Sequence, residues 1–198
     1  MALWFWWVVA ALFFVILGNW SPRKTKLSVV SFIFLFTISS CQELSLVKTL
    51  SDFEKANISI PSEMLYCDGD SISLTQCPKP PLFVAFISAD ECSPCFIETA
   101  SIYGDVFDLG NKYGFSTMLI LSPDKGVMQY CQDLLAREEV QVPLWLDLNN
   151  EFAIANAEKI PEDHRFHYFL LNEDYSPIVV GNPLNHKVKR AIIKARNK

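Results

Sequence analysis

The feature that most constrains the fold is an unbroken apolar run, Leu82–Ile87, followed closely by two cysteines three residues apart. The run lies between several prolines and a short polar stretch, which is the pattern of a buried central strand. The motif Cys92-Ser93-Pro94-Cys95 comes next, and apolar residues then recur at helical spacing up to Leu109. This order predicts a strand, a cysteine pair and a helix that begins at the pair.

The cysteine pair has the spacing of a redox-active disulfide. A cysteine at a helix start lies near backbone N–H groups and the positive end of the helix dipole, and both stabilise its thiolate. Cys95 lies one turn further on, where it can resolve a mixed disulfide formed by Cys92. Pro94 fits the first turn because it has no N–H to lose from the helix. We expect Cys92 to be accessible and Cys95 to be shielded by the helix and Pro94.

The rest of the chain alternates between strand and helix patterns. Apolar runs predict strands, and amphipathic spacing predicts helices that end near glycine or proline. Two late apolar runs flank a polar turn and predict a hairpin. The expected elements are strands over 82–87, 115–121, 142–147, 166–171 and 177–180 and helices over 97–109, 126–137, 151–159 and 187–198. This order predicts an α/β fold in which helices cover both faces of a mixed sheet.

Four segments resemble the thioredoxin-like family, especially its membrane-tethered, TlpA-type bacterial thiol-disulfide oxidoreductases. They are Phe83–Ala89, Val142–Asp147, Phe169–Asn172 and Val180–Pro183, and the resemblance extends from about residue 60 to the C-terminus. It implies a thioredoxin-like fold with an inserted helix–strand unit, and it makes Cys92 the attacking and Cys95 the resolving cysteine. It also implies that the partners are thiols and disulfides of exported proteins and an upstream electron donor, without a cofactor.

The chain departs from the family at positions near the pair. Phe166 stands where the family usually has a proline with a cis peptide bond before it. Glu91 replaces the aromatic residue before the first cysteine, and Phe86 replaces a buried carboxylate. Phe96 follows the second cysteine, where a basic residue is common.

Two acids directly precede the first cysteine. Asp90 and Glu91 should disfavour the Cys92 thiolate and make the pair more reducing, unless the fold brings Arg165 or His167 close enough to offset them. We therefore expect a reductase rather than an oxidant. The alternative is a non-catalytic binding protein of the same fold with a structural Cys92–Cys95 disulfide.

The remaining cysteines and histidines admit simpler roles. Cys67 and Cys77 form a structural disulfide or are two small buried residues. Cys131 falls within a helix pattern and is expected to be buried. His164 and His167 have ligand-like spacing only on a helix. We place them at a strand start, where they would lie on opposite faces and belong to the surface, so no metal site is expected.

The first 40 residues have the pattern of an export signal. Two apolar runs, Met1–Leu17 and Leu27–Ser39, are separated by the basic stretch Arg23-Lys24-Thr25-Lys26. The second run ends in Ile38-Ser39-Ser40-Cys41, which resembles the lipobox of bacterial lipoproteins and implies a lipid on Cys41 after cleavage before it. The alternative is that Cys41 follows an uncleaved transmembrane helix. The first run is either an extra helix or the product of an upstream start codon.

The charge distribution separates this segment from the rest of the chain. Residues 1–40 contain no acid, whereas residues 41–198 carry 14 basic and 22 acidic residues, a formal charge of −8. This balance argues against nucleic acid as a partner. We therefore expect a signal over residues 1–40, a tether over 41–60, and a thioredoxin-like domain over 61–198 that lies outside the cytoplasm, attached to the membrane by its lipid.

Overall fold

The computed structural model describes residues 45–68, 71–126, 129, 131, 133 and 142–197. The chain divides into two compact units, residues 1–48 and 49–198, and the description below concerns the second. The expected signal over 1–40, the lipid site at Cys41 and most of the helix expected over 126–137 lie outside the described residues. Among the helices that can be described, none combines the length and apolar character needed to cross a membrane.

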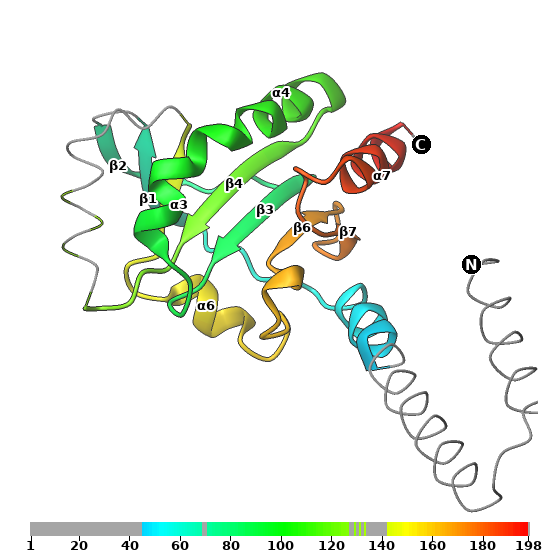
Figure 1. Ribbon diagram of the computed structural model, residues 1–198, viewed down its shortest axis with the longest axis horizontal. Coiled ribbons are helices and arrows are strands. Elements are labelled where there is room, and N and C mark those ends of the chain that lie inside the picture. Colours follow the sequence, from blue (N-terminus) through cyan, green and yellow to red (C-terminus); the bar gives the residue numbers. More distant parts are fainter. Residues whose placement is uncertain are drawn as a thin grey trace, which may run out of the picture. The chain divides into compact units, whose positions relative to one another are not determined.

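The described residues form a mixed sheet of seven strands in the order β2-β1-β5-β4-β3-β6-β7 (Figure 1). Strand β3 is parallel to β4 and antiparallel to β6, and β4 is parallel to β5. Strands β1 and β2 form a hairpin that joins the sheet through antiparallel pairing of β1 with β5. The strands are β1 Glu63–Asp68, β2 Ser71–Gln76, β3 Leu82–Ile87, β4 Ser116–Leu121, β5 Leu144–Leu146, β6 Tyr168–Leu171 and β7 Pro177–Val180.

The helix predicted after the cysteines is broken into three pieces. A 3-10 turn, η1, separates α3 from α4, and Gly114 is the C-cap of α4. Gly114 has φ 69° and donates its N–H to the Gly110 carbonyl, the left-handed cap that glycine favours. A further helix covers residues 45–53. The labelled helices are α3 Ser93–Thr99, η1 Ala100–Tyr103, α4 Gly104–Tyr113, α6 Glu151–Asn156, η2 His164–Phe166 and α7 His186–Arg196.

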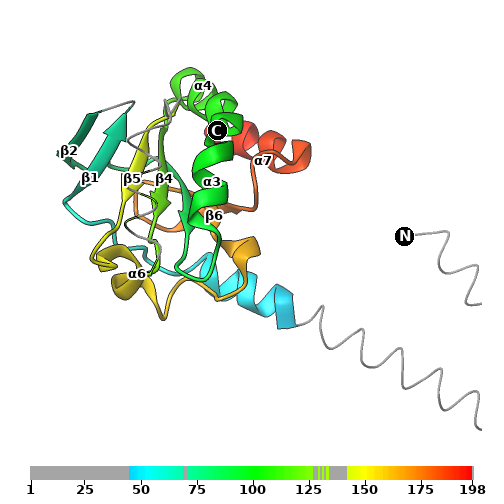
Figure 2. The ribbon, with the colours of Figure 1, turned by 60° about the vertical axis from the view of Figure 1, so that its left-hand side comes forward.

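Strand β3 is the centre of the core, and all six of its residues are buried. Its alternate side chains serve two separate layers because successive residues of a strand point to opposite faces. Phe83, Ala85 and Ile87 belong to the cluster that also contains Ile97 of α3 and Ile192 of α7. Figure 2 shows α3 and α4 along one side of the sheet, with α7 beside them.

The opposite face of the sheet is packed with aromatic rings. Phe86 of β3 contacts Phe152 of α6, with ring centroids 5.1 Å apart. Phe53 contacts Phe169 edge to face at 5.3 Å. Phe53 and Ile58 are both buried, although they precede residue 61, the expected start of the domain. Both faces of the sheet are therefore covered, as the sequence predicts.

The connectivity confirms the predicted fold class. A βαβ unit from β3 to β4 and a ββα unit from β6 to α7 share one mixed sheet, which is the thioredoxin-like arrangement. Strand β5 is the inserted strand expected over 142–147, and its Trp145 is buried. The β1–β2 hairpin was not predicted.

Candidate redox site

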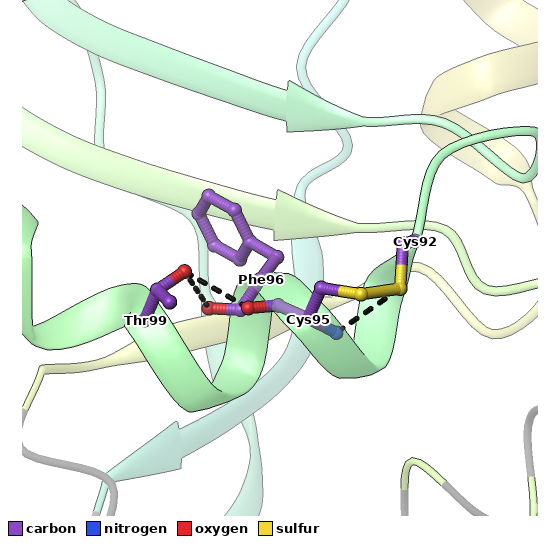
Figure 3. The surroundings of a disulfide bond; sticks show 4 residues. All are labelled: Cys92, Cys95, Phe96 and Thr99. Atoms are coloured by element: carbon purple, nitrogen blue, oxygen red, sulfur yellow. Dashed lines mark hydrogen bonds between the residues drawn. A yellow bond between two sulfur atoms is a disulfide. The ribbon is translucent and has the colours of Figure 1, made fainter.

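The two cysteines of the motif form a disulfide at the start of α3 (Figure 3). Cys92 follows the loop after β3 and is the N-cap residue of the helix, with Pro94 in the first turn. The Cα atoms of Cys92 and Cys95 are 5.3 Å apart, and the Cys95 N–H donates to the Cys92 Sγ atom at 3.3 Å. A donor aimed at Sγ stabilises negative charge on that sulfur when the disulfide is reduced.

Both cysteines are exposed, so the prediction that Cys95 is shielded is wrong. The reason is the orientation of α3. Ser93, Phe96 and Ile97 face the core, and Cys92 and Cys95, which are three residues apart, share the solvent side of the first turn. Exposure therefore does not distinguish the two sulfur atoms, whereas the hydrogen bond to Cys92 does.

An aromatic layer lies behind the exposed pair. The Phe96 ring lies 5.4 Å from that of Tyr103, which in turn stacks on Tyr168 at 6.2 Å. Burial raises the pKa of Tyr168, and its contact with Tyr103 adds to the effect. Ser93 is also buried, and its Oγ has no hydrogen-bond partner among the described residues. The first turn of α3 is thus fixed on its inner side by rigid rings.

The two acids before Cys92 are held within their own loop and by a histidine. The Glu91 Oε2 atom accepts hydrogen bonds from the Ser88 N–H at 3.1 Å, the Ser88 hydroxyl at 3.0 Å and His167 Nδ1 at 2.9 Å. Burial raises the pKa of Glu91, but the bonds from His167 and Ser88 outweigh it and leave the pKa below its ordinary value. The Ser88 hydroxyl likewise lowers the pKa of Asp90.

The segment before β6 is a turn, so the strand predicted to begin at residue 166 begins instead at Tyr168. Asp163 caps this 3-10 turn, η2, by accepting the Arg165 N–H at 3.0 Å. The Arg165 guanidinium also donates to the Asp163 carboxylate at 2.9 Å and lowers the pKa of Asp163 to about 2. Arg165 thus pairs with Asp163 and does not contact the acids beside Cys92.

The histidines do not lie on opposite faces, and the surface assignment is wrong for His167, which is 3% exposed. In a 3-10 helix residues three apart are eclipsed, and the His164 and His167 rings meet edge to face at 5.0 Å. The His167 carbonyl accepts the Phe86 N–H at 2.8 Å, which ties this turn to the end of β3. His167 therefore reaches Glu91, the residue next to Cys92.

Phe166, which stands where the thioredoxin-like family usually has a proline, packs in the core. It is buried, and its ring meets that of Phe53 edge to face at 5.8 Å. The cis peptide bond found in the described residues joins Pro80 and Pro81, before β3.

The structural disulfide suggested for Cys67 and Cys77 is wrong. In the β1–β2 hairpin Cys67 lies opposite Ile72, while the Cys77 N–H donates to the Ser62 carbonyl. The two cysteines are therefore separated by five residue steps along the hairpin, roughly 17 Å, and a disulfide needs Cα atoms within about 7 Å. Cys67 is buried and Cys77 half-buried, so the alternative of two small residues fits better. Cys131 is buried, as expected.

Two further features near the loop 88–90 are not predicted from the sequence. Asp147 is buried after β5, where it accepts hydrogen bonds from the Ser122 hydroxyl at 2.8 Å and the Ala153 N–H at 3.2 Å. These bonds join the ends of β4 and β5 to α6. A cavity of about 480 Å³ lies between α6, the loop 88–90 and His167. The only sequence signal for Asp147 is its position as a polar residue directly after a predicted strand. No pattern in the sequence indicates the cavity.

The strand order defines a thioredoxin-like fold, and the disulfide lies at the start of the helix that follows its central strand β3. No protein-family model and no curated protein matches the sequence. Among solved structures, the chain is similar to a protein described as a thiol:disulfide interchange protein, DsbE, from Chlorobium tepidum. The identity is 11% and the TM-score 0.45, over 71% of this chain and 96% of that one. It is also similar to AhpC of Mycobacterium tuberculosis, at 14% identity and TM-score 0.43, over 71% and 98% of the two chains.

Proposed function

We propose that the chain is a membrane-anchored thiol-disulfide oxidoreductase that acts outside the cytoplasm, as a reductase of exported proteins. The observation that carries this proposal is the exposed Cys92–Cys95 disulfide at the start of α3, with the Cys95 N–H directed at Cys92 Sγ. An accessible pair of this kind can exchange with a substrate disulfide without unfolding of the domain.

In the proposed reaction the reduced pair transfers two electrons. The Cys92 thiolate attacks a substrate disulfide, forms a mixed disulfide and releases one substrate thiolate, which takes up a proton. Cys95 then loses its proton and attacks the Cys92 sulfur, which releases the second substrate thiol and closes the Cys92–Cys95 disulfide. An upstream dithiol donor must reduce this disulfide before the next turnover.

The proposed direction of electron transfer follows from the negative charges next to Cys92. Asp90 and Glu91 both have lowered pKa values, so both are ionised at neutral pH beside Cys92. Two negative charges next to a thiolate disfavour it and thereby favour the disulfide form of the pair. A pair that prefers to be oxidised gives its electrons away readily, which is the property of a reductase.

The exchange step predicts different behaviour for the two cysteines. Cys95→Ser leaves the attacking sulfur but removes the resolving one, so the variant should accumulate mixed disulfides with exported proteins. Cys92→Ser should accumulate none, although its remaining cysteine is also exposed. Non-reducing electrophoresis and mass spectrometry of trapped adducts measure both. Equal trapping by the two variants would contradict the assignment of roles.

The alternative function, a binding protein in which the disulfide is a structural clip, is supported by one observation. Phe166 packs against Phe53 in the core at the position where the family has its proline. In that case neither variant traps a partner, and the wild type does not reduce a model disulfide such as that of insulin.

The membrane anchor is a separate part of the proposal. We propose that Cys41 carries the lipid, because a basic stretch and an apolar run precede it. Mass spectrometry of the mature protein should show a chain that begins at an acylated Cys41, and Cys41→Ser should release the protein from the membrane fraction. A mature protein with an intact N-terminus would refute cleavage.

A further inference from the structure

Beside the disulfide, three metal-ligating side chains converge. Glu91, His164 and His167 offer ligand atoms that all lie within 4.8 Å of one another. The Glu91 Oε2 atom is 2.9 Å from His167 Nδ1 and 3.4 Å from His164 Nδ1. Ligands on a tetrahedral zinc ion, at bond lengths near 2.1 Å, are about 3.4 Å apart. The His164 atom is already at this distance from Glu91, whereas the Glu91–His167 pair must open by about 0.5 Å to admit an ion.

The cluster is fixed by the fold rather than by the three side chains alone. Ser88 holds the Glu91 carboxylate through both its N–H and its hydroxyl. His167 is held by its backbone bond to Phe86 and by ring contact with Phe86 at 5.3 Å. His164 is placed over His167 by the 3-10 turn, since the His167 N–H donates to the His164 carbonyl at 3.1 Å. The fold therefore holds Glu91 and His167 in place and fixes the backbone of His164.

The surroundings of His164 match those of a metal-bound histidine. Its Nδ1 faces Glu91, while its Nε2 lies 3.6 Å from the Asp90 carboxylate. A histidine that ligates a metal through one nitrogen usually directs the other N–H to a carboxylate, which orients the ring. The His164 side chain is 50% exposed, so the cluster is open to solvent on that side.

From this arrangement we infer that Glu91, His164 and His167 form a binding site for a divalent cation of the zinc class, with a solvent-accessible fourth position. Two imidazoles and one carboxylate are a donor set that zinc accepts at open sites. The negative charges of Glu91 and Asp90 favour a cation at this place. The cation takes the position of the proton that His167 Nδ1 shares with Glu91 in the metal-free protein.

The inference is independent of the proposed exchange function, and its test keeps the two apart. The full chain in detergent, with the Cys92–Cys95 disulfide intact, is titrated with Zn²⁺ by calorimetry and with Co²⁺ by absorption spectroscopy. We expect one ion per chain and a Co²⁺ spectrum without thiolate charge-transfer bands. Because the pair stays oxidised throughout, the result does not depend on whether the protein reduces disulfides.

The chain supplies a matched control. It contains three histidines, and His186, the third, is exposed at the start of α7. His164→Ala should weaken Zn²⁺ binding at least about 100-fold, since loss of an outer-shell partner alone costs up to that much. His186→Ala should leave the affinity unchanged. Circular dichroism checks that His164→Ala is folded, which its half-exposed position favours.

Three results would overturn the inference. They are absence of a 1:1 Zn²⁺ complex in the wild type, equal affinity in the wild type and His164→Ala, and thiolate bands that place the ion on a cysteine. In each case the cluster is a set of hydrogen bonds that holds the loop 88–91 in place.

Discussion

Glu91 and Cys92 are neighbours in the chain but lie in two different environments. The Glu91 side chain is 20% exposed and is held by Ser88 and the buried His167. Cys92 is exposed at the start of α3 and is joined covalently to Cys95. One side of this short loop is thus a charged cluster attached to the end of the sheet, and the other is an exposed disulfide on a helix. The difference shows that the fold can fix the residue before the pair and leave the pair itself at the surface.

The largest effect on the cluster around Glu91 is expected from removal of His167, its buried partner. His167→Ala leaves the Glu91 carboxylate without its hydrogen bond from the imidazole and opens space beside Phe86. We expect a loss of about 2–3 kcal/mol in the free energy of unfolding, measured by urea denaturation. His186→Ala, the exposed control, should change it by less than about 0.5 kcal/mol. Equal stability of the two variants would mean that the cluster does not support the loop.

A falling pH should also lower the stability that Glu91 contributes, more gradually than the loss of His167 does. The folded pKa of Glu91 lies below its ordinary value of 4.5, so Glu91 contributes stability above that value. This contribution is lost as the pH falls through the folded pKa, because the protonated carboxyl no longer favours the native contacts. Unfolding measurements between pH 7 and pH 3 should show a flatter acid limb for Glu91→Gln than for the wild type. An identical slope would contradict the lowered pKa.

The smallest expected effect is on the reduction potential of the disulfide, which depends on the charges of the two acids before it. The double change Asp90→Asn and Glu91→Gln removes the negative charges beside Cys92 but keeps side chains of similar size. We expect the reduction potential of Cys92–Cys95 to become more oxidising by about 30 mV, which corresponds to a tenfold change in the equilibrium constant. Equilibration with glutathione buffers measures the potential. A potential that stays the same or becomes more reducing would show that the acids do not act on the pair.

The sequence predicts best where local rules decide the structure. Leu82–Ile87 is an unbroken apolar run, and it forms the buried central strand with the expected bounds. The Cys-Ser-Pro-Cys motif carries its own helix signal, since Pro94 belongs in a first turn, and the helix begins there. Gly114 ends α4 in the left-handed conformation that glycine favours.

It predicts worst where distant residues decide. The sequence predicts a strand from residue 166, but the chain there forms a 3-10 turn whose His167 carbonyl accepts the Phe86 N–H from the distant strand β3. The orientation of α3 was missed because it depends on which side chains the sheet accepts, and these leave Cys95 exposed. The choice between a Cys67–Cys77 disulfide and two separate cysteines stays open in the sequence because nothing in their spacing reveals the register of the β1–β2 hairpin.

The late position of α7 in the chain has a consequence for biosynthesis. Ile192 of α7 is fully buried in the cluster that also contains Phe96 and Ile97 of α3. Strand β6, which pairs with one side of β3, is likewise made about 80 residues after it. Because a chain is synthesised from its N-terminus, the cysteines emerge well before the residues that complete their scaffold. During that interval Cys92 and Cys95 lack part of the core beneath α3, and only the emergence of residues 186–196 completes it.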